Sequence, residues 1–384
     1  MSSDKIETPS SPTTQSAKVS DGGAEPATVQ RALRAGQDWP SNADRVEKIF
    51  LSALEQFPAS APLLGAYANF LRETRKDWKR AEKFYRRALK ADPRHAISLG
   101  NYAVLLKNVR KDYDRAEALY RRALAANPRQ ATNLGNYAVF LDDVRKDYDK
   151  AEEYYRLAVA SNPKHATSLG KYAVFLEDIR GDFEEAEELY RRAIRADAHH
   201  PVNLCNYAIF LQKVRKNYDR AEELYVRAVE EAPEHAVILG KYAKFLKTIR
   251  KDNDLAEEYY LRAIEADPEG AVNLGNYAVF LQTVRQDYDQ AEEYYRRAAE
   301  ASPTNAVILG NYAVFLQTVR EDYDRAEACY RQALEANPRH AISLRNYAAF
   351  LKNIRGNGDL ASEYNRRATE AASGTAKKKK KKKA

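Results

Sequence analysis

A period of 35 residues governs most of this chain. The octapeptide LGNYAVFL at 134–141 returns unaltered at 309–316, and its first leucine has a counterpart in every period. A fixed period of this length is typical of repeat proteins, in which each unit buries its apolar face against its neighbours. The sequence therefore predicts nine stacked units over residues 61–372. The leucines that mark them are Leu64, Leu99, Leu134, Leu169, Leu204, Leu239, Leu274, Leu309 and Leu344.

Each unit has the pattern of two helices. In the unit that begins at Ala131, the apolar residues of 134–141 fall at i, i+3, i+4 and i+7, which is the buried face of an α-helix. A second stripe of Ala151, Tyr155 and Ala158 has helical spacing as well, and Pro163 ends it. The tyrosines on these stripes are expected to pack in the core rather than to bind a ligand.

Two features of the connecting segment bear on its structure. Asp149 followed by Glu152 predicts a capping box that opens the second helix. An arginine precedes this box in every unit, and we expect it to hold the last carbonyls of the first helix and to pair with the acidic residue two positions on. A ladder of anion-binding arginines is the alternative. These residues are Arg75, Arg110, Arg145, Arg180, Arg215, Arg250, Arg285, Arg320 and Arg355.

The second-helix set Ala116, Tyr120, Ala123 and Pro128 recurs in nearly every unit. In these positions the chain resembles the tetratricopeptide repeat family, whose period is about 34 residues. The one extra residue is predicted in the turn after the arginine. The resemblance implies an all-α, right-handed α-solenoid of stacked helix-turn-helix repeats. It further implies a non-enzymatic scaffold that binds a protein or an extended peptide in the concave groove of the superhelix.

Two other functions stay open. Pentatricopeptide repeats also have a 35-residue period and read single-stranded RNA, but the 12 residues from Ala81 to Pro93 are too few for their second helix. The half-repeat variant found in RNA-processing proteins is closer in spacing, so an RNA-associated processing factor is one alternative. A regulatory arm for an enzyme on another chain is the other.

The first helix offers candidate partner-binding residues opposite its buried stripe. With Leu134 at 0°, Asn136 falls at about 200° and Val139 at about 140° on a helical wheel, the side that lines the groove in tetratricopeptide superhelices. An asparagine amide both donates and accepts, which suits the backbone of an extended peptide. Hydrogen bonding between neighbouring repeats is the alternative role. The candidates are Asn101, Asn136, Lys171, Asn206, Lys241, Asn276, Asn311 and Asn346, with Val104, Val139, Val174, Ile209, Val279 and Val314 beside them.

A glycine precedes most of these asparagines, and each costs about 1 kcal/mol of helix propensity relative to alanine. The register adopted here gives the family's small packing position to Ala138, so the glycine is predicted to border the groove instead. Something must approach it closely, either a neighbouring helix or a bound backbone. The glycines are Gly65, Gly100, Gly135, Gly170, Gly240, Gly275 and Gly310.

No catalytic or metal-binding constellation is evident, so we expect no enzyme activity and no cofactor or metal. Five of the six histidines share one repeat position in the turn after the proline, where a role in helix entry is expected. The two cysteines, Cys205 and Cys329, stand in unrelated contexts, which favours a reducing, intracellular and cytoplasmic location. No apolar run reaches the roughly 18 residues that a membrane span requires.

The net charge of +8 comes mainly from seven lysines at 377–383. This run predicts a nuclear-localisation signal, a weak contact with nucleic acid or an anionic surface, or an extension without function. The sequence divides into a disordered Ser/Thr/Pro-rich segment at 1–26, a divergent half or capping repeat at 27–60, the repeats at 61–372 and a flexible lysine tail at 373–384. In the capping repeat, Val46, Phe50 and Ala53 have second-helix spacing.

Overall fold

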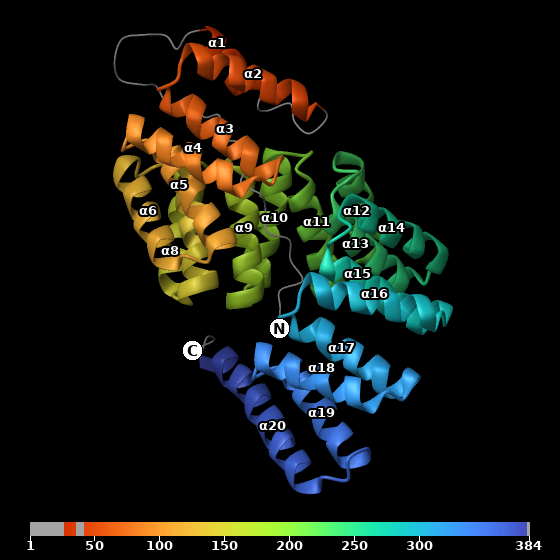
Figure 1. The fold of residues 1–384 in the computed structure, drawn as a ribbon. Helices are drawn as coiled ribbons and strands as arrows, with labels where there is room; N and C mark the ends of the chain where they lie inside the picture. Colours follow the sequence, from red (N-terminus) through yellow and green to blue (C-terminus); the bar gives the residue numbers. More distant parts are fainter. Residues whose placement is uncertain (1–26, 36–41, 382–384) are drawn as a thin grey trace. The chain divides into compact units, whose positions relative to one another are not determined.

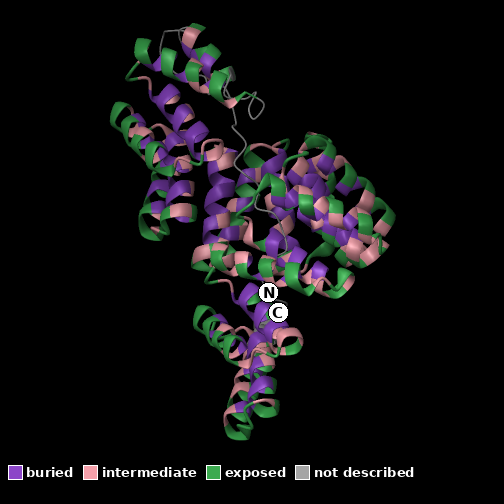
Figure 2. Cartoon of the chain, turned by 45° about the vertical axis from the view of Figure 1, so that its right-hand side comes forward, coloured by how far each residue is buried: buried purple, intermediate pink, exposed green. Residues whose placement is uncertain are grey.

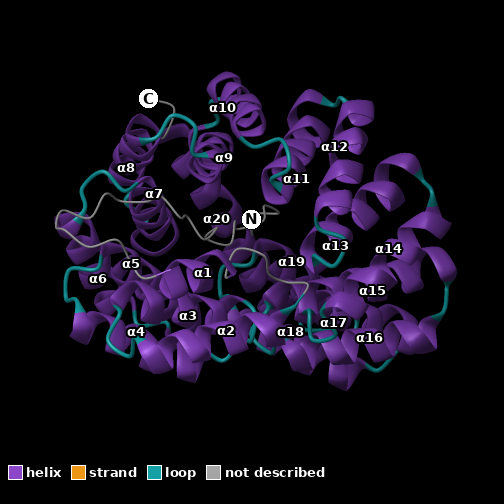
Figure 3. Cartoon of the chain, turned by 90° about the horizontal axis from the view of Figure 1, so that it is seen from above, coloured by secondary structure: helices purple, strands orange, loops and turns teal. Residues whose placement is uncertain are grey.

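The computed structural model of the chain describes residues 27–35 and 42–381, with side chains to residue 373. The Ser/Thr/Pro-rich segment predicted at 1–26 lies outside these residues. Every regular element of the described ranges is a helix, joined to the next by a short turn (Figure 3). The predicted all-α solenoid of helix-turn-helix repeats is therefore confirmed.

Each repeat contributes a first and a second helix, which follow one another along the chain (Figure 1). Two further helices, α1 (Ala27–Ala35) and α2 (Ala43–Gln56), precede them. The first helices are α3 (Ala61–Glu73), α5 (Ala96–Leu105), α7 (Ala131–Phe140), α9 (Ala166–Phe175), α11 (Pro201–Phe210), α13 (Ala236–Phe245), α15 (Ala271–Phe280), α17 (Ala306–Phe315) and α19 (Ala341–Asn353). The second helices are α4 (Trp78–Ala91), α6 (Tyr113–Ala126), α8 (Tyr148–Ser161), α10 (Phe183–Ala196), α12 (Tyr218–Glu231), α14 (Asn253–Ala266), α16 (Tyr288–Ala301), α18 (Tyr323–Ala336) and α20 (Gly358–Lys381).

The chain divides into two compact units, Met1–Ala198 and His199–Ala384. Within each unit, a second helix packs on the first helix of its own repeat and on the first helix of the next, as α6 does on α5 and α7. Neighbouring first helices also pack on each other, for example α5 on α7 and α13 on α15. The first helices therefore form one layer of each unit and the second helices form the other.

The core lies between the two layers, where the sequence placed it. The predicted stripes of the first and second helices are buried, and Figure 2 shows buried residues along the helix faces that meet. Tyrosines link successive repeats: the ring of Tyr155 in α8 stacks on that of Tyr172 in α9 with centroids 5.6 Å apart. The tyrosines on the stripes are core residues, as predicted, because burying a large aromatic ring is strongly favourable.

The extra residue of the period is accommodated by the end of the first helix. In seven repeats a π-helical turn follows the α-helical part, and a residue in the left-handed conformation follows the turn. In the repeat that begins with α7, the turn ends at Arg145, Lys146 has φ of 55°, and the Asp147 N–H bonds to the Leu141 carbonyl at 3.0 Å. The wider turn starts before the arginine, so the insertion is not confined to the position after it. The turns are η1 (Leu106–Arg110), η2 (Leu141–Arg145), η3 (Leu176–Arg180), η4 (Leu211–Arg215), η5 (Leu246–Arg250), η6 (Leu281–Arg285) and η7 (Leu316–Arg320).

The predicted capping box at Asp149 and Glu152 is wrong by two residues. Helix α8 begins at Tyr148, and Asp147 caps it by accepting a hydrogen bond from the Lys150 N–H at 3.3 Å. The sequence offers an aspartate at both positions. The first one caps the helix because it directly follows the left-handed residue that turns the chain. Asp149 then lies in the first helical turn, where it contacts the next repeat.

The two ends of the described structure also bear on the sequence predictions. In α2, Val46, Phe50 and Ala53 are buried, and the ring of Phe50 lies 5.5 Å from that of Tyr67. At the other end, α20 continues to Lys381. The backbone is thus helical within the segment at 373–384 for which a flexible tail was predicted, and alanine and lysine are both good helix formers.

Candidate binding face on the first helices

The recurrent glycine is a packing residue between neighbouring first helices. A Cβ added to Gly135 in α7 would lie 3.2 Å from Ser168 Oγ in α9, and a Cβ on Gly100 in α5 would overlap the amide of Asn133 in α7. The sequence predicted that something approaches this glycine closely, and the structure shows such a close approach. Of the two neighbours that the sequence left open, the adjacent helix is the one present. A helical wheel gives the direction in which a residue points, but it does not give the distance to the next helix.

A polar ladder holds the first helices together at this contact. The Asn133 Nδ2 donates to the Ala96 carbonyl at 2.9 Å, and Ser168 Oγ donates to the Ala131 carbonyl at 3.3 Å, each reaching back to the start of the preceding first helix. Sequence reasoning missed this ladder. Its signal is the serine or asparagine that directly precedes the repeat leucine in most units. The contacts recur in unit 2 through Asn273 and Ser343.

The predicted binding residues lie on the first helices with different degrees of burial. Asn136 is 5% exposed and Asn206 is 1% exposed, whereas Asn311 is exposed. The remaining members of the asparagine and lysine set are half-buried: Asn101, Lys171, Lys241, Asn276 and Asn346. Of the aliphatic set, Ile209 is buried and the others are half-buried: Val104, Val139, Val174, Val279 and Val314.

Asn136 has a donor without an acceptor. Its Oδ1 accepts a hydrogen bond from Lys171 Nζ at 2.7 Å, but its Nδ2 is buried and has no partner in the described part of the chain. A buried amide N–H without an acceptor costs about 1–3 kcal/mol, so native proteins rarely leave one unsatisfied. A carbonyl that arrives from outside would remove this cost once the surrounding side chains move enough to admit it.

Four asparagines of the set make no side-chain hydrogen bond between repeats. No hydrogen bond joins the side chains of Asn276, Asn311 or Asn346 in unit 2 to the described residues, and the same holds for Asn101 in unit 1. Hydrogen bonds that join first helices come from the ladder at Asn133 and its equivalents, and in unit 1 also from Lys171 to Asn136. These amides are therefore available for other contacts.

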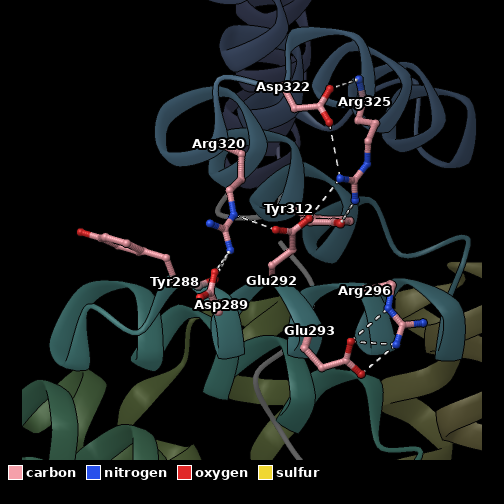
Figure 4. A network of polar contacts seen from close by, with 9 residues as sticks. All are labelled: Tyr288, Asp289, Glu292, Glu293, Arg296, Tyr312, Arg320, Asp322 and Arg325. Carbon is pink, nitrogen blue, oxygen red and sulfur yellow. Dashed lines mark hydrogen bonds and ion pairs between the residues drawn. The ribbon is translucent and has the colours of Figure 1, made fainter.

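The arginine of each repeat is paired with carboxylates of the preceding repeat. Arg145 Nη2 lies 2.6 Å from Asp114 Oδ1, and its Nε lies 2.7 Å from Glu117 Oε2, both in α6. In unit 2, Arg320 makes the same contacts with Asp289 at 2.6 Å and Glu292 at 2.7 Å (Figure 4). The predicted pairing with the acidic residue two positions on is wrong. Carboxylates already neutralise these arginines, which speaks against an anion-binding ladder.

The histidines at the repeat position lie at helix entries, as predicted. His95 precedes α5, and its Nδ1 lies 2.8 Å from Ser98 Oγ. Burial lowers the pKa of His95, and Asp92 opposes this shift weakly. His165 and His340 make the corresponding contacts with Ser168 and Ser343, each at 2.7 Å.

The described residues contain no group of three or more His, Cys, Asp or Glu side chains that is placed to hold a metal ion. Cys205 is buried, and burial raises the pKa of the half-buried Cys329 thiol. A thiol with a raised pKa is a poor nucleophile at neutral pH. None of the described helices combines the length and apolar character that crossing a membrane demands.

Comparison with solved structures identifies similar folds at low sequence identity. One is a chain of the APC/C hetero-tetramer Cut9-Hcn1, with a TM-score of 0.61 and 16% identity over 89% of this chain. The alignment spans 62% of that chain, which is less than two thirds of its length. Another is the human IFIT1 dimer with m7Gppp-AAAA, with a TM-score of 0.57 and 18% identity over 91% of both chains. No curated protein matches the sequence.

Family models match most of the repeat region. The tetratricopeptide repeat model matches residues 71–131, 103–166, 143–201 and 319–376. A second model, described as TmcB, TPR repeats, matches residues 198–272, and a Sel1 repeat model matches residues 268–303. The two tetratricopeptide models together cover more than half of the 384 residues. With its paired helices, small packing residues and stacked repeats, the chain belongs to the tetratricopeptide repeat family.

Proposed function

We propose that the chain is a non-enzymatic scaffold whose first helices bind an extended segment of a partner protein. The observation that carries this proposal is the buried amide of Asn136, which has a donor and no acceptor. A peptide backbone supplies a carbonyl acceptor irrespective of its side chains. Half-buried Val139 lies one helical turn further along α7 and adds apolar contact area beside the amide.

The polar ladder formed by Asn133, Ser168 and their equivalents also supports the proposal. Spacing and joining of the first helices is already accomplished by glycine and by the side chains of Asn133 and Ser168. Of the asparagines one helical turn further on, Asn136 adds a hydrogen bond to Lys171, whereas the side chains of Asn276 and Asn311 make none to the described residues. The similar APC/C chain comes from a hetero-tetramer, so the same fold takes part in a protein assembly there.

RNA association is the second candidate, because the fold matches human IFIT1 with m7Gppp-AAAA over 91% of both chains. The first helices of unit 1 do not favour it. Asp143 and Asp178 lie exposed on successive repeats there, with Asp142 and Glu177 beside them. Carboxylates repel the phosphate backbone on which nucleic-acid affinity depends. The lysine run at 377–383 is a separate element, so any RNA binding should be measured with and without it.

A display library of unstructured peptides provides the test. Peptides selected on the wild-type chain should lose about tenfold or more in affinity for the variant Asn136→Ala, because the amide contact to the peptide backbone is lost. The melting temperature should stay within a few degrees, since the substitution also removes an unsatisfied donor. Glu293→Ala on the outer side of α16 is the matched control and should bind like the wild type. Equal affinities for wild type and Asn136→Ala would contradict the proposal.

A further inference from the structure

We propose that the first helices of unit 2 recognise an acidic segment of the partner through Lys244 and Lys247. This inference rests on the proposed function and names the partner chemistry at one part of the same face. Both lysines come from a single repeat, Lys244 in α13 and Lys247 in the π-helical turn η5.

Lys244 is the one cation at a repeat position that is aliphatic in most repeats. The equivalent residues of six repeats are the valines and isoleucine of the predicted binding face, the first repeat has Asn69, and the last has Ala349. Lys244 is exposed, and no side chain among the described residues pairs with it. A single cation at a position that carries neutral side chains in the other repeats gives this repeat a different ligand preference. The aliphatic equivalents are Val104, Val139, Val174, Ile209, Val279 and Val314.

Lys247 occupies the position of a lysine that forms a salt bridge in another repeat, but the residue opposite it is not a carboxylate. In unit 1, Lys107 occupies the equivalent position, and its Nζ lies 2.5 Å from Asp143 Oδ2 of the next repeat. In unit 2, the residue equivalent to Asp143 is Thr283, and Lys247 Nζ donates to its Oγ1 at 3.0 Å. The two lysines reach the same place on the next repeat, but only Lys107 finds a negative charge there.

The electrostatics of Lys247 are correspondingly unfavourable. Burial lowers its pKa, and the positive charges of Lys244 and Lys251 lower it further. The contact with the face of the Phe280 ring, 5.8 Å from the centroid, offsets only part of this cost. A partly desolvated ammonium beside like charges is stabilised when an anion comes close. A glutamate or aspartate of a bound segment supplies that anion.

An acidic protein segment fits this site better than a nucleic acid does. Binding of single-stranded nucleic acid depends on aromatic side chains on which bases stack. Among the described residues of unit 2, the most exposed large aromatic side chain is Tyr288 at 40%, and it opens the second helix α16 rather than lying on a first helix. On the next first helix, the residue equivalent to Lys244 is half-buried Val279, and Lys247 lies over the ring of Phe280. The site thus presents cations beside an aliphatic surface.

The substitution Thr283→Asp tests the inference within the full chain. By analogy with Asp143, the new carboxylate should pair with Lys247 and compete with an acidic ligand. The probe is a labelled extended peptide that alternates glutamate with valine. Its affinity should fall about tenfold in Thr283→Asp and in Lys247→Gln, and added salt should weaken its binding to the wild type. Thr318→Asp is the matched control, because Gln282 stands there in place of the lysine, and it should bind like the wild type.

Two further probes separate the possible outcomes. A peptide with glutamine in place of glutamate should bind the wild type more weakly than the acidic peptide and should be insensitive to Thr283→Asp. If both peptides bind equally, the acidic preference is overturned while the proposed function stands. If neither peptide binds, the acidic inference is overturned, and the proposed function is decided by the selected peptides and Asn136→Ala. Tighter binding of single-stranded oligouridylate than of the acidic peptide, abolished by Lys247→Gln, would replace the protein segment with a nucleic acid.

Discussion

Lys171 donates a hydrogen bond to the buried carbonyl oxygen of Asn136 across a repeat boundary, with Nζ and Oδ1 2.7 Å apart. The bond fixes the orientation of the amide, so that Nδ2 is the atom left without an acceptor. The candidate site of unit 1 is therefore a pair of residues from two repeats. The lysine sets the direction in which the asparagine can donate.

This pair predicts a coupled effect of two substitutions. Lys171→Met should destabilise the chain by about 1–2 kcal/mol, because the buried oxygen of Asn136 then also lacks a partner. The same substitution made in an Asn136→Leu background should cost much less, since no buried amide remains. Urea unfolding of the four variants in a double-mutant cycle measures the coupling. Additive effects would show that the two side chains do not interact.

The packing glycines predict opposite outcomes for one substitution at two sites. Gly100→Ala should destabilise by about 1–3 kcal/mol, because its Cβ would overlap the Asn133 amide and break the bond to the Ala96 carbonyl. Gly275→Ala should instead stabilise by up to about 1 kcal/mol through helix propensity. There the nearest atom is Ile308 Cγ1 at 3.5 Å, an ordinary contact.

Thermal melts followed by circular dichroism compare the two glycine variants. Asn133→Ala made together with Gly100→Ala is the control for the mechanism, because it removes the overlapping amide and should recover part of the loss. A destabilised Gly275→Ala would contradict the assignment of this contact.

The arginine network predicts that its two carboxylates contribute unequally. Glu292 is 24% exposed and Asp289 is 92% exposed, although both lie within 2.7 Å of Arg320. Glu292→Gln should therefore destabilise by about 1–2 kcal/mol, whereas Asp289→Asn should change stability by less than about 0.5 kcal/mol. Glu292 also accepts from Arg325 at 3.0 Å (Figure 4), which adds to its effect. Unfolding midpoints at low and high salt show which variant loses more stability. Equal losses in Glu292→Gln and Asp289→Asn would refute the prediction.

The periodic features of this chain could be read from its sequence, and the contacts between repeats could not. The 35-residue period and the buried stripes predicted the helix pairs, because they depend on geometry within one helix. The partner of Arg145 lies 28 residues earlier, at Glu117, and the neighbour of Gly135 lies 33 residues later, at Ser168. Such pairs depend on how far apart stacked helices lie, which spacing within a helix does not reveal.

The asparagine positions could be predicted from the sequence only in part. The wheel placed Asn136 and Val139 on a face away from the main stripe, and the structure adds that Asn136 is nonetheless buried and bonded to Lys171. The spacing of residues within one helix does not reveal which of them a neighbouring repeat buries. The assignment of these residues to a partner stays a prediction.

Acidification should destabilise the chain through His95. Burial lowers the pKa of this histidine below its ordinary value of 6.5, so the unfolded chain binds the proton more readily than the folded one. Stability is therefore fully present above pH 6.5 and is lost as the pH falls toward the folded pKa, by up to about 1.4 kcal/mol per pH unit for one proton. Urea unfolding between pH 7 and 5 measures the slope. His95→Gln should reduce it, and an unchanged slope would show that His95 does not contribute.

The left-handed residue after each π-helical turn predicts a second matched pair of variants. Glu321 has φ of 55° and Gly181 has φ of 69° at the equivalent position of another repeat. A side chain costs about 1–2 kcal/mol in this conformation, whereas glycine adopts it freely. Gly181→Val should therefore destabilise by at least about 1 kcal/mol, more than for an unbranched side chain. Glu321→Gly should leave stability unchanged or raise it slightly, because the relief of strain offsets the added entropy of the unfolded chain.

No side chain lies within 4 Å of a Cβ built on Gly181, so any loss of stability in Gly181→Val reports on the backbone alone. Thermal melts of both variants give the comparison, and a Gly181→Val variant as stable as the wild type would show that the turn tolerates another conformation.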